Sequence, residues 1–513
     1  MDDPLCTSRV TLCADPFGPV NGYYVGHDEP SVEFKSSTPG SGNDMTYTFT
    51  LPTDPTTQPT ASGATGSTWG FQLHPTFWFG LAMCDNESAP EFTTTCNPDT
   101  DANNLVGSDP KSADYIGKHP GTAFMELQFY GPGYVPQFEG FGCTATQYCA
   151  AMNIDSRTLD MNNGEENTAA CNNFILGGGE PINWAYVTRD GKSQAPANPL
   201  FTGTFSNPNF SAVNPDPSKD LLMNPGDSIR VRLHDTTAGF QSDLTDLNTG
   251  QSGTMTASIA NGFGHILFTP NSKTCQEAPY AFHPAYSTAN PRGNVWTAHT
   301  YNVAFSDEIG HFENCLTIST TTFNCTQPGS QDASGLDEDD GHNACVPGTD
   351  STVVKINGCL ASDFDWDGQS YRLDWPGTNP NPAQDRLLHP TPVQFTSPVT
   401  ATGQGYPAVA FETDLPAIES AQDNAPFCDV ITGANCVNPP NGAQFYPFFT
   451  TTHHGGTCMW QEGGNNLPGT VDRFGGSSTT EFGPLQFIVF PVSHFRPATA
   501  TNDFNSGDLA NPC

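Results

Sequence analysis

AFMELQFYGPG, at residues 123–133, is an alternating run of aromatic, aliphatic and polar residues that ends in a glycine–proline turn. Alternation with a period of two is typical of a strand, and glycine next to proline is a turn signal. Helical periodicity is hard to find elsewhere, and similar strand-like runs recur at residues 45–51, 67–83, 182–191, 227–235, 254–260, 299–305, 408–415 and 485–492. The sequence therefore predicts an all-β fold, an antiparallel β-sandwich or jelly roll with a calcium-loop insert.

The 16 cysteines indicate a chain stabilised by disulfides in an oxidising compartment. Their number is even, and no Cys-x-x-Cys pair is present, which argues against zinc ribbons and redox motifs. Cys513 at the end of the sequence predicts a bridge that ties down the C-terminal tail. The first residues lack the basic and apolar segments of an export signal, and no apolar run is long enough to span a membrane. We therefore expect a mature, secreted protein without a membrane span.

Acidic residues dominate the charge of the chain. It has 54 Asp and Glu against 17 Lys and Arg, a net charge of -37 at pH 7. A field of this sign repels phosphate backbones and anionic lipid headgroups, and no basic stripe reverses it locally. The sequence therefore predicts no nucleic-acid partner. The acidity has two interpretations, tolerance of low pH or a means of staying soluble.

A change of composition divides the chain into three segments. Residues 318–380 are turn-rich and acidic with few strand signals, which predicts a connector or an ion-binding insert. Residues 1–317 are long enough for two packed jelly rolls, which would divide near residues 212–220. Residues 381–513 return to strand patterns and form a C-terminal β region.

The strongest local motif is the acidic loop DFDWDGQSYRLD at residues 363–374. Oxygen ligands at the first, third and fifth positions, glycine at the sixth and a carboxylate at the twelfth are typical of a calcium loop. Flanking helices are absent, so an EF-hand is not expected, and a solvated acidic turn is the alternative. We expect a structural calcium site with the ligands Asp363, Asp365, Asp367, Tyr371 and Asp374.

A second cluster, SDEIGHFENC at residues 306–315, combines carboxylates with a histidine. In a strand, Asp307, His311 and Glu313 share one face and form a candidate acid–base or metal site. In a helical turn, Glu308 and His311 share a face instead. The alternative is that each histidine is satisfied by hydrogen bonds. A transition-metal site is a further hypothesis, with the candidate ligands His283, His299, Glu308 and His311 and with His265 as an additional imidazole.

Glu126 interrupts the apolar run at residues 123–130. A carboxylate on a buried strand is costly unless it is paired or has a chemical role. Period-two alternation places Phe124, Gln128 and Tyr130 on its face, and an acid, an amide and aromatic rings are what a sugar-binding groove needs. The alternative is that these rings belong to the core. Candidate binding residues are Gln128, Tyr130, Trp184 and Trp296, and glycoside hydrolysis would pair Glu126 with Glu313 or Asp307.

Five motifs between residues 70 and 376 carry a resemblance to a known group of proteins. They are AFMELQFYGPGYVPQ, LLMNPGDSIRVRLHD, LTDLNTGQSG, DEIGHFENC and DFDWDGQSYRLDWPG. In these motifs the chain resembles a family of secreted, cysteine-containing β-proteins known as hypothetical proteins of bacteria. The resemblance implies export and a shared fold, and it transfers no activity and no catalytic residue.

Three functions are consistent with the sequence. The first is a calcium-stabilised glycoside hydrolase that acts on an extracellular polysaccharide or cell-surface polymer and uses Glu126 with the carboxylates of residues 307–313. The second is a metal-dependent extracellular enzyme, and the third is a non-catalytic cell-surface or structural β-protein. Paired carboxylates in a cleft would favour the first, a three-ligand metal centre the second, and flat faces without a cleft the third.

Overall fold

The fold is mostly β. A computed structural model describes residues 31–36, 40–53, 77–87, 122–131, 144, 146–156, 167–171, 182–202, 215–284, 295–301, 315–318, 325–328, 393–414, 449–462, 503–505 and 509–513. Within these ranges helical structure is limited to residues 169–171, the short helix α2 (Pro199–Thr202) and the 3-10 turn η4 (Ile259–Asn261). All strand pairs described are antiparallel, which confirms the prediction of an antiparallel, mostly-β protein.

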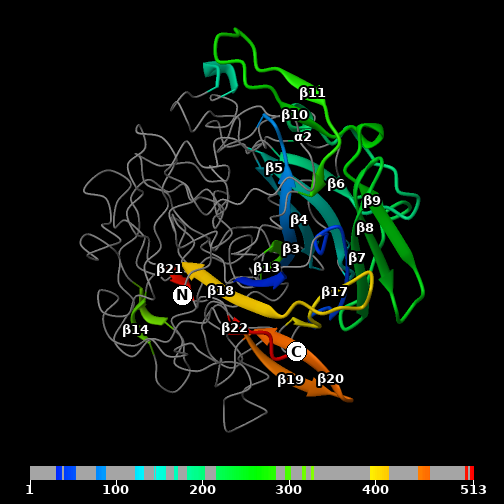
Figure 1. Cartoon of the computed structure of the whole chain (residues 1–513), viewed down its shortest axis with the longest axis vertical. Coiled ribbons are helices and arrows are strands. Elements are labelled where there is room, and N and C mark those ends of the chain that lie inside the picture. Colours follow the sequence, from blue (N-terminus) through cyan, green and yellow to red (C-terminus); the bar gives the residue numbers. More distant parts are fainter. Residues whose placement is uncertain are drawn as a thin grey trace.

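One sheet has ten strands and runs in the order β21-β18-β1-β13-β3-β4-β5-β6, with β12 paired to β3 and β22 paired to β18. Figure 1 shows β3, β4, β5 and β6 near the centre of the molecule. The strands are β1 (Ser31–Ser36), β3 (Phe77–Cys84), β4 (Thr122–Tyr130), β5 (Cys149–Ser156), β6 (Ile182–Tyr186), β12 (His283–Pro284), β13 (Val295–Tyr301), β18 (Ala408–Asp414), β21 (Asp503–Asn505) and β22 (Leu509–Ala510).

The second sheet has eight strands in the order β19-β20-β16-β2-β7-β8-β9, with β17 paired to β2. Its strands are β2 (Asp44–Thr50), β7 (Ser228–Thr236), β8 (Gly239–Asp246), β9 (Ser252–Thr256), β16 (Gln394–Phe395), β17 (Val399–Thr400), β19 (Phe449–His454) and β20 (Thr457–Glu462). Two separate hairpins are β10 (Gly264–Ile266) with β11 (Glu277–Pro279), and β14 (Cys315–Ile318) with β15 (Cys325–Pro328).

Both sheets combine strands from distant parts of the chain. In the ten-stranded sheet β1 pairs with β18, and in the eight-stranded sheet β2 pairs with β16. Backbone hydrogen bonding in each sheet therefore crosses the division that composition suggests between residues 1–317 and 381–513.

A large hydrophobic core joins the two sheets. Tyr47 of the eight-stranded sheet lies 4.5 Å from Phe79 of the ten-stranded sheet, measured between ring centroids, and Phe49 lies 4.7 Å from Phe129. Phe34 meets Trp460 edge-on in the same way. Each of these rings is almost completely buried, and burial of one such side chain stabilises the fold by about 1.5–3 kcal/mol. These edge-on and tilted aromatic contacts between the two sheets hold the sheets together.

The strands β4, β5 and β6 are also covered on their second face. Met125, Leu127 and Phe129 of β4 belong to the large core, because successive residues of a strand point to opposite sides of the sheet. The alternate residues face a smaller cluster, and β6 is buried at every position. This second cluster consists of Tyr130, Cys149, Ala151, Ile182, Trp184 and Tyr186.

Disulfides link segments that are far apart in the sequence. Cys171 bonds to Cys275 across 104 residues, and Cys458 bonds to Cys513, which confirms the predicted bridge at the C-terminal tail. Cys84 and Cys149 are also disulfide-bonded, and the part of the chain that the structure describes contains no free cysteine. The bridges indicate an oxidising compartment. Among the described residues no helix is long and apolar enough to cross a membrane.

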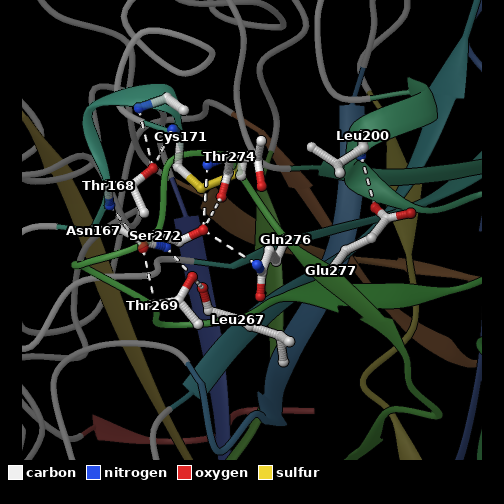
Figure 2. Close-up of a disulfide and its surroundings, with 12 residues drawn as sticks. Asn167, Thr168, Cys171, Leu200, Leu267, Thr269, Ser272, Thr274, Gln276 and Glu277 are labelled. Carbon is white, nitrogen blue, oxygen red and sulfur yellow. Dashed lines mark hydrogen bonds between the residues drawn. A yellow bond between two sulfur atoms is a disulfide. The ribbon is translucent and has the colours of Figure 1, made fainter.

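Figure 2 shows the surroundings of the Cys171–Cys275 bridge. Asn167 joins the same two segments by hydrogen bonds, because its Nδ2 donates to the carbonyl of Leu267 over 2.9 Å and its Oδ1 accepts from the Thr269 amide over 3.1 Å. The bridge and the amide side chain thus fasten residues 167–171 to the β10–β11 hairpin.

Candidate functional site

A chain of side-chain hydrogen bonds leads from the buried second face of β4–β6 to Glu126. The Nε1 of Trp184 donates to the Tyr130 hydroxyl over 3.1 Å, and this hydroxyl donates to the Gln128 side-chain oxygen. The Nε2 of Gln128 in turn donates to Oε2 of Glu126 over 2.7 Å. Glu126, Gln128 and Tyr130 alternate along one strand, so the structure brings together the four residues that sequence periodicity and aromatic content single out.

Burial differs between the two ends of this chain. Trp184 is 1% exposed and packs edge-on against Tyr186 at 4.3 Å, whereas Glu126 and Gln128 are only partly buried. A ring that stacks against a sugar needs an exposed face. Tyr130 and Trp184 are therefore buried hydrogen-bond donors at one end of this chain, and Glu126 is at its more exposed end.

Glu126 lies in a row of register-paired residues that crosses five neighbouring strands. It is opposite Gly80 on β3 and opposite Asn153 on β5, and Asn153 is opposite Trp184 on β6. On the far side of Gly80 the register places His299 of β13. Gly80 has no side chain, so the position in this row between His299 and Glu126 carries none.

Asn153 is the residue of this row with an unmet polar group. It is 6% exposed, and its Oδ1 has no hydrogen-bond partner in the part of the chain that the structure describes. Asp155 follows two positions later on β5, in register with Phe124, and is therefore diagonal to Glu126. The sequence did not single out either residue, because CAAMNIDS has no aromatic residue and only one β-branched residue, Ile154, and so lacks the pattern by which the other strands were found.

Many of the predicted site residues lie outside the described residues. These are Asp307, Glu308, His311 and Glu313, together with the calcium-loop residues Asp363, Asp365, Asp367, Tyr371 and Asp374. The backbone alone is described for Trp296, which is in register with Lys35 of β1, and for His299. The pairings of Glu126 with Asp307 or Glu313, and the calcium site, stay predictions.

Three histidines of the described region, His234, His265 and His283, are paired with aspartates. The Nδ1 of His283 lies 2.7 Å from Asp235, and the Nδ1 of His265 lies 2.7 Å from the buried Asp85. Along β3, His283 is in register with Cys84 and His299 with Gly80, four positions or about 13 Å apart. No three metal-ligating side chains come together among the residues described.

Asp220 is a buried carboxyl group beside the second cluster. Its Oδ2 accepts from the Asp216 amide over 2.7 Å, and its Oδ1 accepts from the Gln194 side chain. Burial raises the pKa of Asp220 to about 7. The two hydrogen bonds lower this pKa, but burial outweighs them. Burial also raises the pKa of Tyr186, with smaller contributions from Tyr130 and Asp220. Asp220 could not be singled out from the sequence, because it stands at the end of a stretch rich in proline that indicates a linker.

The raised pKa of Asp220 predicts a pH-dependent stability. The ordinary pKa is 3.8, so between that value and about 7 the folded protein binds a proton that the unfolded chain releases. Proton binding by Asp220 therefore stabilises the folded state at low pH. The free energy of unfolding falls as pH rises, by about 2–3 kcal/mol between pH 5 and 8. Asp220→Asn should remove this part of the slope in urea unfolding measured across that range, and an unaltered slope would contradict the assignment.

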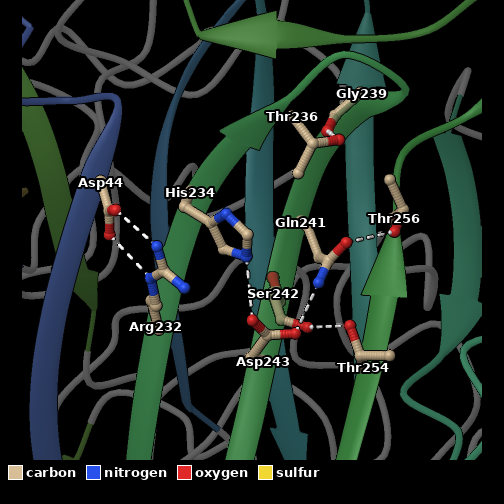
Figure 3. A network of polar contacts seen from close by, with 10 residues as sticks. All are labelled: Asp44, Arg232, His234, Thr236, Gly239, Gln241, Ser242, Asp243, Thr254 and Thr256. Carbon is tan, nitrogen blue, oxygen red and sulfur yellow. Dashed lines mark hydrogen bonds and ion pairs between the residues drawn. The ribbon is translucent and has the colours of Figure 1, made fainter.

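The outer face of β2, β7, β8 and β9 carries a polar network, which Figure 3 shows. Arg232 donates to both oxygens of Asp44, over 2.9 and 2.6 Å, and holds the pKa of that carboxyl group below its usual value. His234 and Gln241 both contact Asp243. These groups form hydrogen bonds with one another and are partly exposed to solvent. We therefore interpret the network as a solvated sheet face, on which ion pairs contribute little to stability.

A cleft of about 410 Å³ lies beside the Cys458–Cys513 bridge. Ser397 and Asn511 line it, and they hydrogen-bond to each other and, through Asn511, to the carbonyl of Tyr406. The described side chains that line the cleft include no acidic or basic residue. The described lining of the cleft therefore offers space and hydroxyl groups.

Comparison of the chain with protein-family models, with curated proteins and with solved structures finds no match. What is established is a cysteine-containing, mostly-β protein with disulfides. Its function must be inferred from the residues themselves.

Proposed function

We propose that this chain is a secreted, carbohydrate-active protein, and specifically a glycoside hydrolase in which Glu126 is a catalytic carboxylate. The observation that carries the proposal is the hydrogen-bonded chain from buried Trp184 through Tyr130 and Gln128 to Glu126. Catalytic groups are held in place by partners that are themselves fixed by packing. Gln128, which contacts the partly buried Glu126 carboxylate, is itself held through Tyr130 and Trp184, so the carboxylate has the supported position that a catalytic group needs.

Glycoside hydrolysis needs a second carboxyl group, about 5–9.5 Å from the first. One carboxyl group protonates the leaving oxygen, and the other attacks the sugar or activates water. Asp155 is a candidate besides Asp307 and Glu313, because diagonal residues on paired strands have Cα atoms about 7–8 Å apart. Which of the three works with Glu126 decides whether the configuration of the sugar is retained or inverted.

The wider setting fits the same proposal. Aromatic contacts between the two sheets support a β-sandwich, and disulfides support an extracellular location. We retain the calcium loop at residues 363–374 as part of the proposal, because its ligand spacing suits the ion. A lower melting temperature after chelation would support a bound calcium ion, and an unchanged one would count against it.

The test is sugar release from plant, fungal and bacterial polysaccharides at acidic and neutral pH. Glu126→Gln should lower the rate at least about a hundredfold, because the amide cannot transfer the proton or act as a nucleophile. Glu277→Gln is the matched control, since Glu277 is another partly buried glutamate that accepts a hydrogen bond, from the Leu200 amide, outside the site. Release that survives in Glu126→Gln would exclude Glu126 as a catalytic residue. No release by the wild type, with metals supplied, would favour a binding or structural protein.

A further inference from the structure

We propose that Asn153 is a substrate-binding residue whose side-chain oxygen accepts a hydrogen bond from a hydroxyl group of a neutral polysaccharide lying across Glu126. The inference rests on the proposed function and names the class of substrate and one of its contacts.

Buried polar atoms in folded proteins nearly always have a hydrogen-bond partner. Asn153 is 6% exposed, and its Oδ1 has none within the described part of the chain. Turning the side-chain amide over would place its nitrogen in the same buried position, so either orientation leaves a polar atom unmet. A protein keeps such a group at a cost, and a ligand that supplies the missing partner is a physical reason to keep it.

The position of Asn153 indicates where this ligand lies. It is directly opposite Glu126 on β4 and directly opposite Trp184 on β6. Directly opposed residues have Cβ atoms about 4.5–5.5 Å apart, roughly the width of one sugar ring. On the other side of Glu126 the row continues to Gly80, which brings no side chain. A polymer that contacts Asn153 would therefore place a neighbouring bond beside the Glu126 carboxylate.

The charge of the site selects a neutral substrate. The described strands β3, β4, β5 and β6 contain no lysine or arginine, while Glu126 is acidic and the whole chain has a net charge of -37. An anionic polymer would be repelled. A cation is less suitable, because no three metal-ligating side chains meet among the residues described, whereas a hydroxyl group needs a single acceptor.

Asn183 provides a matched control on the neighbouring strand. It is buried, as Asn153 is, but its Oδ1 accepts from the Gly264 amide over 2.9 Å and its Nδ2 donates to the Ile154 carbonyl over 3.4 Å. Leucine has nearly the shape of asparagine. Asn183→Leu leaves two backbone groups unpaired and should lower the melting temperature, whereas Asn153→Leu removes an unmet group and should leave it equal or higher.

The experiment combines melting temperatures with the binding of soluble oligosaccharides, made from the neutral polymer that the wild type cleaves best. Binding is measured by calorimetry to Glu126→Gln and to the Glu126→Gln/Asn153→Leu double variant. Loss of the hydroxyl contact should weaken binding about ten- to a hundredfold, without a fall in melting temperature.

Equal affinity of Glu126→Gln and the double variant for the oligosaccharide would overturn the proposed role of Asn153. The same result is expected if a buried water molecule, and not the sugar, is the partner of the Asn153 side-chain oxygen. A melting temperature that falls as it does in Asn183→Leu would show a structural partner and overturn it as well. Either result leaves the proposed function standing as long as Glu126→Gln is inactive. Full activity of Glu126→Gln would overturn the proposed function itself, and a wild type that neither binds nor cleaves any polymer would overturn both.

Discussion

Replacing Cys171 and Cys275 by alanine is expected to lower the free energy of unfolding by about 4–5 kcal/mol. The bridge closes a loop of 104 residues, and closing a loop of that length removes much of the conformational freedom of the unfolded chain. Cys171 is also fully buried, so its removal takes packing from the interior. The midpoint of urea unfolding measures the effect.

The Cys458–Cys513 bridge is the control for this prediction. Its sequence separation is 55, which lowers the expected loss by about 0.5 kcal/mol, and Cys513 is exposed. The first double variant should therefore be the less stable of the two. A loss below about 1 kcal/mol for Cys171 and Cys275 would mean that the hydrogen bonds of Asn167 already hold the two segments together.

Asp85→Ala is expected to cost about 3–5 kcal/mol. The Asp85 carboxylate is fully buried and accepts hydrogen bonds from Nδ1 of His265 over 2.7 Å and from the Glu87 amide over 3.0 Å. His265 in turn stacks on Tyr280 with ring centroids 4.2 Å apart. Alanine would leave both donors without an acceptor inside the protein, and equilibrium unfolding at neutral pH measures the loss.

Asp243→Ala is the matched comparison, since Asp243 also contacts a histidine, His234, over 2.9 Å. The Asp243 side chain is 36% exposed, so water can replace it as a hydrogen-bond partner, and the expected loss is below about 1 kcal/mol. Equal losses in the two variants would show that burial does not decide the strength of these pairs.

Strands with one apolar face were predictable from the sequence. The run at residues 123–130 corresponds to β4, residues 227–235 to β7, and residues 408–415 to β18, each within one residue at either end. Alternation identifies such strands because one set of alternate side chains faces the core. The run at residues 485–492 lies outside the described residues.

Strands that break this pattern were missed. In β8 the inward positions include Ser242 and Asp246, both fully buried, so the apolar alternation is interrupted. In β5 the residues from Cys149 to Ile154 are buried on both faces, and small residues replace the usual β-branched ones. Two runs also extended too far. For example, the run at residues 254–260 passes the end of β9, where Ser258 caps the 3-10 turn η4.

The candidate site was partly predictable for the same reason. Period-two alternation placed Gln128 and Tyr130 beside Glu126, and the hydrogen bonds between them agree with it. Alternation within one strand could not predict that Asn153 lies opposite Glu126, because the residue opposite depends on the register between two strands, which arises from the pairing of distant segments. Asp220 depends on burial, which a stretch rich in proline and aspartate does not reveal.

The most direct test of the account is the crystal structure of Glu126→Gln with a bound oligosaccharide from the polymer that the wild type cleaves. We expect the sugar on the β4–β5 face, with a glycosidic oxygen within hydrogen-bond reach of residue 126 and a hydroxyl group on Asn153. A sugar bound instead in the cleft beside the Cys458–Cys513 bridge, with no ligand near residue 126, would contradict it.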